Sequence, residues 1–177
     1  DIVHQGYAAK ILQNSLDLNM LYKSKNNIVL LDSINDPRNQ GAIIRSCLAF
    51  NIYDIIIEKK FYKQDNLSMH IASSGATMKV RIYEVSNLNN IIKILKNNNF
   101  FIYGLDNSGT NSIEEYEFNQ NKNVLIFGSE GSGLRKNISK KCDNILKINI
   151  NDDIDSLNVS NASAISLYEL YKKTARK

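Results

Sequence analysis

Short apolar runs alternate along the chain with stretches in which apolar residues recur at helical spacing. The apolar runs predict strands at residues 28–31, 53–57, 80–85, 100–103, 124–127 and 145–150. The periodic stretches predict helices at residues 41–50, 65–73, 88–96 and 156–172. Because the strands are apolar throughout, both faces of their sheet should be covered. The pattern predicts an α/β fold with a mostly parallel sheet and helices on both faces.

Residues 1–25 differ from the rest of the chain because they contain no apolar run of the strand type. Residues 11–22 form an amphipathic stretch, and we interpret residues 1–25 as a linker or lead-in helix. Residues 26–177 then form one α/β domain, which is long enough to bury a sizeable core.

Composition narrows the function only slightly. The formal net charge of +4 is compatible with nucleic-acid binding but does not require it. No apolar run approaches the ~20 residues of a membrane-spanning helix, so no membrane partner is expected. The two cysteines, Cys47 and Cys142, lack a metal-binding spacing, and only two histidines are present. We therefore expect no metal site and two buried free thiols, as in a reducing, cytoplasmic environment.

A first polar constellation follows the strand predicted at residues 28–31. Pro37 fixes its own backbone and disfavours helix at Asp36, so we expect Asn39 to be the N-cap of the next helix. Arg45 interrupts the apolar run of that helix and must pair with a carboxylate, extend to solvent or bind a ligand. An ordinary capped helix with a paired arginine is the alternative interpretation.

A second constellation directly follows the strand predicted at residues 124–127 and reads Gly128-Ser129-Glu130-Gly131-Ser132-Gly133-Leu134. Its glycines allow a tight turn with exposed backbone N–H groups. The spacing matches neither a phosphate-binding P-loop nor a dinucleotide fingerprint, which argues against a dinucleotide-dependent oxidoreductase. Glu130 would repel an anion and suits a cationic or hydroxyl-bearing ligand. Alternatively, Glu130 is solvated or pairs with Arg45.

The third constellation is Ser156-Leu157-Asn158-Val159-Ser160, where polar residues run into the helix predicted at residues 156–172. Serine and asparagine are indifferent helix formers, so the cluster predicts a helix start that faces a polar group. Simple capping by Asp155 or Ser156 is the alternative.

In this order, the three constellations resemble the three signature motifs of the SpoU (TrmH) class of RNA ribose methyltransferases, in the SPOUT superfamily. The resemblance spans residues 26–171. It implies an α/β domain with a C-terminal trefoil knot, a homodimer with each active site close to the subunit interface, and a small RNA-binding domain preceding residues 1–25. The final helix, including Ala162, Ile165, Leu167 and Leu170, is expected to supply part of that interface or to cover the sheet.

The resemblance also implies S-adenosyl-L-methionine as cofactor and RNA as the partner that receives its methyl group on a ribose 2′-hydroxyl. The residues that match the family's catalytic positions are Asn39, Arg45, Glu130, Ser156 and Asn158. Those that match its donor-binding positions are Leu105, Gly128, Ile148 and Leu157. The chain departs from the family's usual pattern at Gln40, Asn149 and Asp152, which bears on local packing and on the loop before Ser156.

The family assigns the role of catalytic base to the arginine that matches Arg45. A base works best when it titrates near the working pH, whereas arginine stays protonated in proteins. We therefore interpret Arg45 as the group that grips an RNA phosphate and stabilises the developing alkoxide. The resemblance favours a guanosine of large-subunit (23S) ribosomal RNA as the target. Transfer RNA, or a non-catalytic RNA-binding module of the same fold, are the alternatives.

Overall fold

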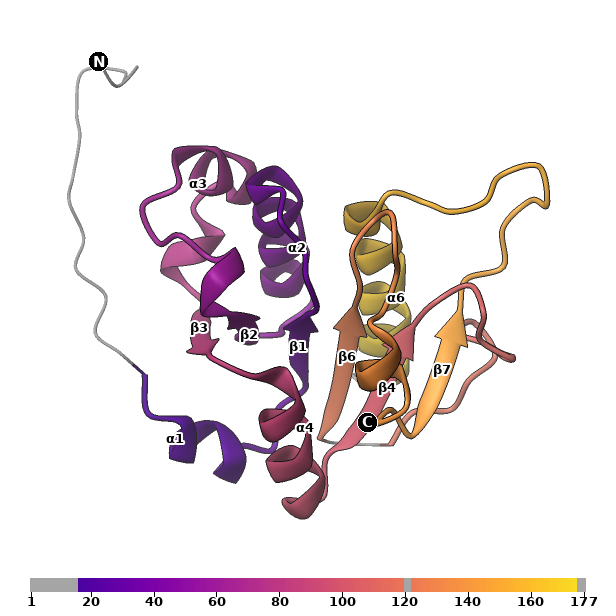
Figure 1. Cartoon of the computed structure of the whole chain (residues 1–177), viewed down its shortest axis with the longest axis horizontal. Helices are drawn as coiled ribbons and strands as arrows, with labels where there is room; N and C mark the ends of the chain where they lie inside the picture. Colours follow the sequence, from indigo (N-terminus) through magenta and orange to yellow (C-terminus); the bar gives the residue numbers. More distant parts are fainter. Residues whose placement is uncertain (1–15, 120–121, 175–177) are drawn as a thin grey trace.

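The structure is a computed structural model that describes residues 16–119 and 122–174. Within those residues, seven strands form one sheet in the order β3-β2-β1-β6-β4-β7-β5, and neighbouring strands run parallel (Figure 1). The predicted parallel α/β sheet is thereby confirmed. The strands are β1 (Ile28–Leu31), β2 (Asp54–Glu58), β3 (Arg81–Val85), β4 (Phe101–Leu105), β5 (Asn111–Ser112), β6 (Asn123–Phe127) and β7 (Asn144–Lys147).

Helices cover both faces of the sheet, as its fully apolar strands require (Figure 1). One hydrophobic cluster joins one face of the sheet to α2, α3 and α6, and a second joins the other face to α1, α4 and α5. The helices are α1 (Leu18–Lys23), α2 (Pro37–Ala49), α3 (Leu67–Ser73), α4 (Leu88–Asn97), α5 (Lys136–Ser139) and α6 (Val159–Thr174), with short 3-10 turns η1 (Lys59–Phe61) and η2 (Ala76–Met78).

The strand order places a topological switch between β1 and β6. From β1 the chain builds outward through β2 and β3, whereas β6 and β4 occupy the other side of β1. In parallel α/β sheets, ligands bind outside the carboxyl ends of the strands at such a switch. The first and second constellations leave β1 and β6 at this edge, so the fold brings them together.

The first helix starts earlier than predicted. α2 begins at Pro37, and its N-cap is Asp36 rather than Asn39, since Asp36 Oδ1 accepts a hydrogen bond from the Arg38 backbone N–H at 2.8 Å. Proline suits the first helical position because its missing N–H would have no partner there. Asn39 therefore lies within the first turn, and its side chain is available for contacts elsewhere.

The last helix starts later than predicted. α6 begins at Val159 rather than at residue 156, and β7 ends at Lys147 rather than at residue 150. The Oδ1 of Asn158 accepts the backbone N–H of Ser160 at 2.8 Å, which is how a capping residue ends a loop and opens a helix. Residues 148–158 consequently form a long loop between β7 and α6 (Figure 1).

Three smaller expectations also meet the structure. The described part of the lead-in forms only α1 (Leu18–Lys23), and the rest of the predicted 11–22 stretch lies outside the described residues. Both cysteines are free thiols, and burial raises their pKa, although Cys142 is only partly buried whereas Cys47 is fully buried. None of the described helices is long and apolar enough to cross a membrane.

Candidate active site

A pocket of about 370 Å³ opens at the carboxyl ends of β6, β4 and β7. Its walls come from residues 105–107 after β4, residues 127–133 after β6, and parts of the stretch 146–162. This volume lies in the range of roughly 300–1,000 Å³ that is typical of small-molecule sites. The pocket therefore has the size and the position in the fold of a ligand site.

The wall that follows β6 is a tightly closed glycine loop. Ser129 and Gly133 exchange backbone hydrogen bonds of 3.1 and 2.9 Å. A Cβ on Gly128 would lie 2.2 Å from the carbonyl carbon of Gly133, and Gly133 itself has a φ of +61°. Glycine is needed at both positions because any side chain would force the loop open. By contrast, a Cβ on Gly131 would meet nothing within 4 Å.

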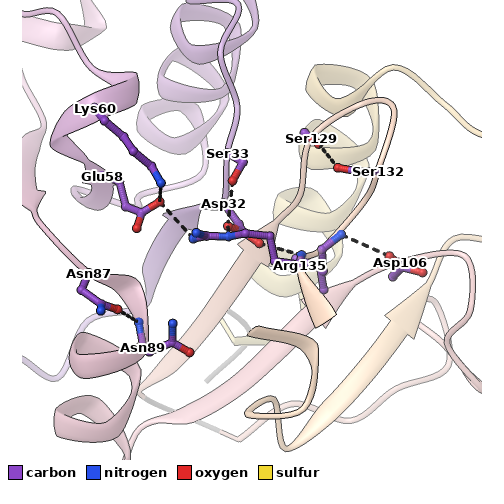
Figure 2. A network of polar contacts seen from close by, with 11 residues as sticks. Asp32, Ser33, Glu58, Lys60, Asn87, Asn89, Asp106, Ser129, Ser132 and Arg135 are labelled. Carbon is purple, nitrogen blue, oxygen red and sulfur yellow. Dashed lines mark hydrogen bonds and ion pairs between the residues drawn. The ribbon is translucent and has the colours of Figure 1, made fainter. Parts of the chain in front are cut away.

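A buried ion network fixes the exit of this loop (Figure 2). The Arg135 backbone N–H and Nε donate to the two carboxylate oxygens of Asp32 at 2.9 and 2.5 Å. The Nη2 of Arg135 also donates to Glu58 Oε2 at 3.0 Å, and Lys60 Nζ lies 3.6 Å from the same oxygen. Asp32 is fully buried at the end of β1. The network thus ties the loop to the ends of both β1 and β2.

A second carboxylate, that of Asp106, supports the loop from below (Figure 2). Its Oδ1 accepts hydrogen bonds from the Ser108 hydroxyl and backbone N–H at 2.7 and 3.0 Å, and its Oδ2 accepts the Leu134 N–H at 3.4 Å. Burial acts to raise the pKa of Asp106, but these hydrogen bonds outweigh it and hold the pKa below its usual value. Asp106 is therefore an anion at neutral pH, and it lines the pocket.

Three side chains from the three constellations meet beside the pocket. The Nδ2 of Asn39 donates to Glu130 Oε1 at 2.9 Å, and Asn158 Nδ2 donates to the same oxygen. Asn158 Nδ2 also lies 3.3 Å from the Oδ1 of Asn39. Within the described residues, Glu130 Oε2 accepts no hydrogen bond, so it remains available to a ligand. We call Asn39, Glu130 and Asn158 the amide–carboxylate cluster.

This cluster settles the partner of Glu130. The carboxylate accepts from two side-chain amides, so the alternative pairing with Arg45 is wrong. Arg45 is exposed on α2, and its side chain makes no hydrogen bond or ion pair with any described residue. Arg38, on the same helix, pairs with Asp36 at 2.9 Å.

The positions predicted to hold a donor all line the pocket: Leu105, Gly128, Ile148 and Leu157. Of the predicted catalytic residues, Glu130 and Ser156 line it as well, whereas Asn39 and Asn158 reach it through Glu130. Ser156 is exposed in the long loop, where the Asn107 amide donates to the neighbouring Asp155 carbonyl. The structure therefore gathers eight of the nine predicted site residues at one place, and Arg45 is the one without a contact there.

Sequence reasoning missed the residues that brace the pocket. Asp32, Arg135 and Asp106 carry the contacts described above, but none belonged to a motif considered in the sequence. A signal was present for each: Asp32 and Asp106 directly follow apolar strands, and Arg135 directly follows the glycine loop. A charged residue at such a boundary is often buried by the sheet edge and must then find a partner.

The chemistry of the pocket favours a ligand with positive charge and apolar parts. Glu130, Asp106 and Asp155 contribute acceptor oxygens or negative charge, while leucine and isoleucine side chains supply apolar walls. Within the part of the chain that the structure describes, no cluster of histidine, cysteine and carboxylate side chains could hold a metal ion.

The family to which this site belongs is shown by comparison. A family model described as the SpoU rRNA Methylase family matches residues 26–168. This chain belongs to the SpoU rRNA methylase family. A tRNA/rRNA methyltransferase of Borreliella burgdorferi is 37% identical over a match that covers 96% of this chain and 80% of that protein.

Two further proteins place this SpoU family member among its relatives. The 23S rRNA (guanosine-2'-O-)-methyltransferase RlmB of Xanthomonas campestris is 31% identical, and the match covers 96% of this chain and 71% of that protein. The crystal structure of the SpoU methyltransferase AviRb from Streptomyces viridochromogenes, in complex with the cofactor AdoMet, matches with a TM-score of 0.83 at 22% identity. That match covers 93% of this chain and 67% of AviRb, and it concerns the fold alone.

Proposed function

We propose that this SpoU domain is an S-adenosylmethionine-dependent RNA methyltransferase that modifies a ribose 2′-hydroxyl. The observation that carries the proposal is the amide–carboxylate cluster. It joins residues from three segments far apart in the chain, and it lies at the rim of a pocket of ligand size. Such a cluster can hold a hydroxyl group beside a bound small molecule.

The pocket's residues fit S-adenosylmethionine. Leu105, Ile148 and Leu157 offer apolar contact for a purine ring, and the loop at Gly128 offers backbone groups at close approach. The negative charge of Asp106 and Glu130 matches the positive charges of the sulfonium and the amino group. When bound, S-adenosylmethionine supplies an electrophilic methyl group on its sulfonium sulfur.

The chain's own residues would orient the acceptor. Asn39 and Asn158 both donate to Oε1 of Glu130, which fixes the carboxylate and leaves Oε2 to accept a hydrogen bond from the ribose 2′-hydroxyl. That bond would aim the hydroxyl oxygen into the pocket, toward the methyl group that bound S-adenosylmethionine would supply. Arg45 would bind an RNA phosphate and stabilise the developing alkoxide, while the hydroxyl proton would leave along its hydrogen bond to Glu130 Oε2 and pass on to a phosphate oxygen or a water.

The names of two relatives suggest, by analogy, which RNA this chain modifies. The RlmB relative is named for a guanosine of 23S ribosomal RNA, and the Borreliella relative for both transfer and ribosomal RNA. We therefore favour a guanosine of large-subunit ribosomal RNA, with transfer RNA as the second choice. The free thiols at Cys47 and Cys142 are consistent with activity in the reducing cytoplasm.

A homodimer is also part of the proposal. Leu167 and Leu170 are fully buried in the chain's own core, so that side of α6 covers the sheet. The opposite side leaves Ile165, Tyr168 and Tyr171 exposed, at 39%, 50% and 36%. Such exposed apolar side chains on one helix favour a protein contact, and a sedimentation experiment that shows dimers would support it.

We also propose that the C-terminal segment is threaded as a trefoil knot. The proposal is supported by the path of residues 148–158, which leave β7 beside the sheet's edge, and by α6, which packs back against α2. Mechanical unfolding of single molecules tests it, because a knotted chain pulled from both ends extends less than its full contour length.

The experiment that tests the function is methyl transfer from labelled S-adenosylmethionine to total RNA, followed by mapping of the modified nucleotide. The wild-type chain should produce a 2′-O-methylated ribose, and Glu130→Gln or Asn158→Ala should lower turnover by roughly 100-fold. Asn137→Ala, exposed on α5 and outside the pocket lining, is the matched control and should stay near wild type. Calorimetry that shows no binding of the donor would favour the non-catalytic RNA-binding module instead.

A separate variant tests the role of Arg45. Arg45→Lys keeps the charge but loses the planar fork of donors, so turnover at saturating RNA should fall at least about tenfold. Arg38→Lys, on the same helix, is the control. Nearly full turnover in Arg45→Lys would show that no specific guanidinium role exists.

A further inference from the structure

A second pocket opens at the carboxyl ends of β1 and β2, and it shares no lining residue with the first. Its volume is about 420 Å³. Two lysines, Lys60 and Lys63, line it together with three side-chain amides, a proline and Phe61, and no carboxylate lines it. We call it the lysine pocket.

The carboxylates closest in sequence to the lysine pocket do not cancel its charge. Glu58 is buried and already accepts from Arg135 at 3.0 Å. Asp36 pairs with Arg38 at 2.9 Å, which lowers the pKa of Asp36 through the hydrogen bonds from Arg38. Asp65 is exposed to solvent. The lysines therefore present net positive charge to whatever enters.

The two lysines differ in how far they are neutralised. Lys60 Nζ lies 3.6 Å from Glu58 Oε2, a long contact to an oxygen that another cation already occupies. Lys63 is exposed, and its side chain makes no ion pair or hydrogen bond with any residue that the structure describes. Lys59, next to Lys60 in the same turn, is exposed as well and adds a third positive charge.

The turn that carries these lysines is held firmly in place. The buried amide of Gln40 donates to the carbonyl oxygens of Ile34 and Phe61, both at 2.7 Å. Tyr62 is 8% exposed and belongs to the hydrophobic core, and burial raises its pKa to about 12. Because Gln40 and Tyr62 fix the backbone of the turn, binding of a ligand would have to order only the lysine side chains.

The lysine pocket is linked to the candidate active site through two adjacent residues of α2. Gln40 lines the lysine pocket, and its neighbour Asn39 donates to Glu130, which lines the first pocket. The two pockets therefore flank the amide–carboxylate cluster along one edge of the sheet. A polymer whose reactive unit lies at the cluster would pass over the lysines.

We propose that the lysine pocket binds the phosphate–ribose backbone of the RNA strand beside the nucleotide that receives the methyl group; the inference rests on the function proposed above. Lysine ammonium groups form sequence-independent contacts with phosphates, and such contacts set the register of a strand. The ring of Phe61 lines the same pocket, with Lys60 Nζ over it at 4.7 Å from the ring centroid, so a cation and an apolar group lie side by side for a phosphate and its sugar. The amide of Gln40, where the chain departs from the family's usual apolar residue, builds the pocket.

The test measures binding of a fluorescently labelled single-stranded RNA oligonucleotide of mixed sequence by anisotropy, over a range of salt concentrations. The variants are Lys60→Gln, Lys63→Gln and both together, with Lys93→Gln as control, since Lys93 is exposed on α4 on the other face of the sheet. Each lost phosphate contact lowers the salt slope of binding by about 0.7. The double variant should lose about 1.4 in slope and roughly tenfold in affinity near 0.1 M salt, while Lys93→Gln matches wild type.

A footprint on the unmutated chain provides a second measurement. Acetylation of lysines, read by mass spectrometry, should slow at Lys60 and Lys63 when the oligonucleotide is present and stay unchanged at Lys93. Wild-type slope in the double variant, equal acetylation with and without RNA, or no RNA binding by the wild-type chain would each overturn the proposal.

These outcomes are distinct from failure of the proposed function. If the wild-type chain transfers methyl groups but the lysine variants bind RNA normally, the pocket assignment is wrong and the function stands. If the variants weaken RNA binding but the wild-type chain binds no S-adenosylmethionine, the lysine pocket stands and the methyltransferase assignment fails.

Discussion

Two loops line the same pocket, and they differ in how firmly their contacts hold them in place. The glycine loop at residues 128–134 is closed by its own backbone and tied down by a buried ion network. The loop at residues 148–158 is largely exposed, and a few local contacts hold it, such as the Asn149 amide on Ser112 at 3.1 Å. The difference indicates that the glycine loop is a preformed, rigid wall of the pocket, whereas the loop at residues 148–158 can change its conformation. The glycine loop would therefore fix the position of the ligand, and the exposed loop would adjust to it.

The largest expected effect comes from breaking the anchor of the rigid loop. Arg135→Met leaves the fully buried Asp32 without its cation, so the free energy of unfolding should fall by about 3–5 kcal/mol. Denaturant unfolding measures this change. The control is Arg38→Met, which removes an exposed ion pair with Asp36 and should leave the free energy of unfolding nearly unchanged. Equal losses in the two variants would show that the buried network does not anchor the loop.

A smaller effect is expected from opening the loop itself. Gly128→Ala places a Cβ against the backbone of Gly133, which should cost about 1–3 kcal/mol in unfolding free energy and weaken donor binding. Gly131→Ala, in open space in the same loop, should change neither quantity. Comparison of the two variants distinguishes a requirement for close backbone packing at Gly128 from a general effect of replacing a loop glycine. Normal donor binding in both variants would contradict the rigid-wall interpretation.

The pH dependence of stability tests the contribution of Asp106, which holds the glycine loop through the backbone N–H of Leu134. The folded-state pKa of Asp106 lies below its unfolded value of about 3.9, so its carboxylate stabilises the native state above that pH. This contribution is lost as the pH falls through the folded-state pKa. The stability advantage of wild type over Asp106→Asn should therefore be complete well above pH 4, shrink as the pH falls below about 4, and vanish only below the folded-state pKa. Parallel curves at all pH values would exclude this role.

The smallest effect on stability should come from the exposed loop. Asn107→Ala removes the amide that donates to the Asp155 carbonyl, and unfolding free energy should change by about 0.5 kcal/mol or less. Limited proteolysis within residues 148–158 should nevertheless become faster, because a contact that restrains the loop is gone. Asn137→Ala, exposed on α5, is the control. Unchanged proteolysis would mean that the loop is already fixed by other contacts.

The sequence was most informative where one local signal dominates. The apolar runs at Ile28–Leu31 and within Asn123–Phe127 predicted buried strands. A short segment that is apolar on both faces is typical of a central strand in a parallel sheet that helices cover on both sides. Capping was harder to predict. Asp36 and Asn39 are both good caps, and only the preference of Pro37 for the first helical position decides between them.

Contacts between distant segments could not be derived from periodicity. Asp32 and Arg135 are 103 positions apart, and nothing in the local pattern pairs them. The start of α6 was misplaced for a related reason: Ser156 reads as a cap locally, but Asn158 takes that position while it also donates to Glu130. The two-residue strand β5 is too short to leave any periodic signal.

The most direct test of the account is a calorimetric titration of S-adenosylmethionine into the wild-type chain, Gly128→Ala and Gly131→Ala. The account predicts one donor bound per chain in wild type and in Gly131→Ala, and at least about tenfold weaker binding in Gly128→Ala. Equal affinity in all three chains, or no binding to any of them, would contradict the claim that the glycine loop forms the fixed wall of a donor pocket.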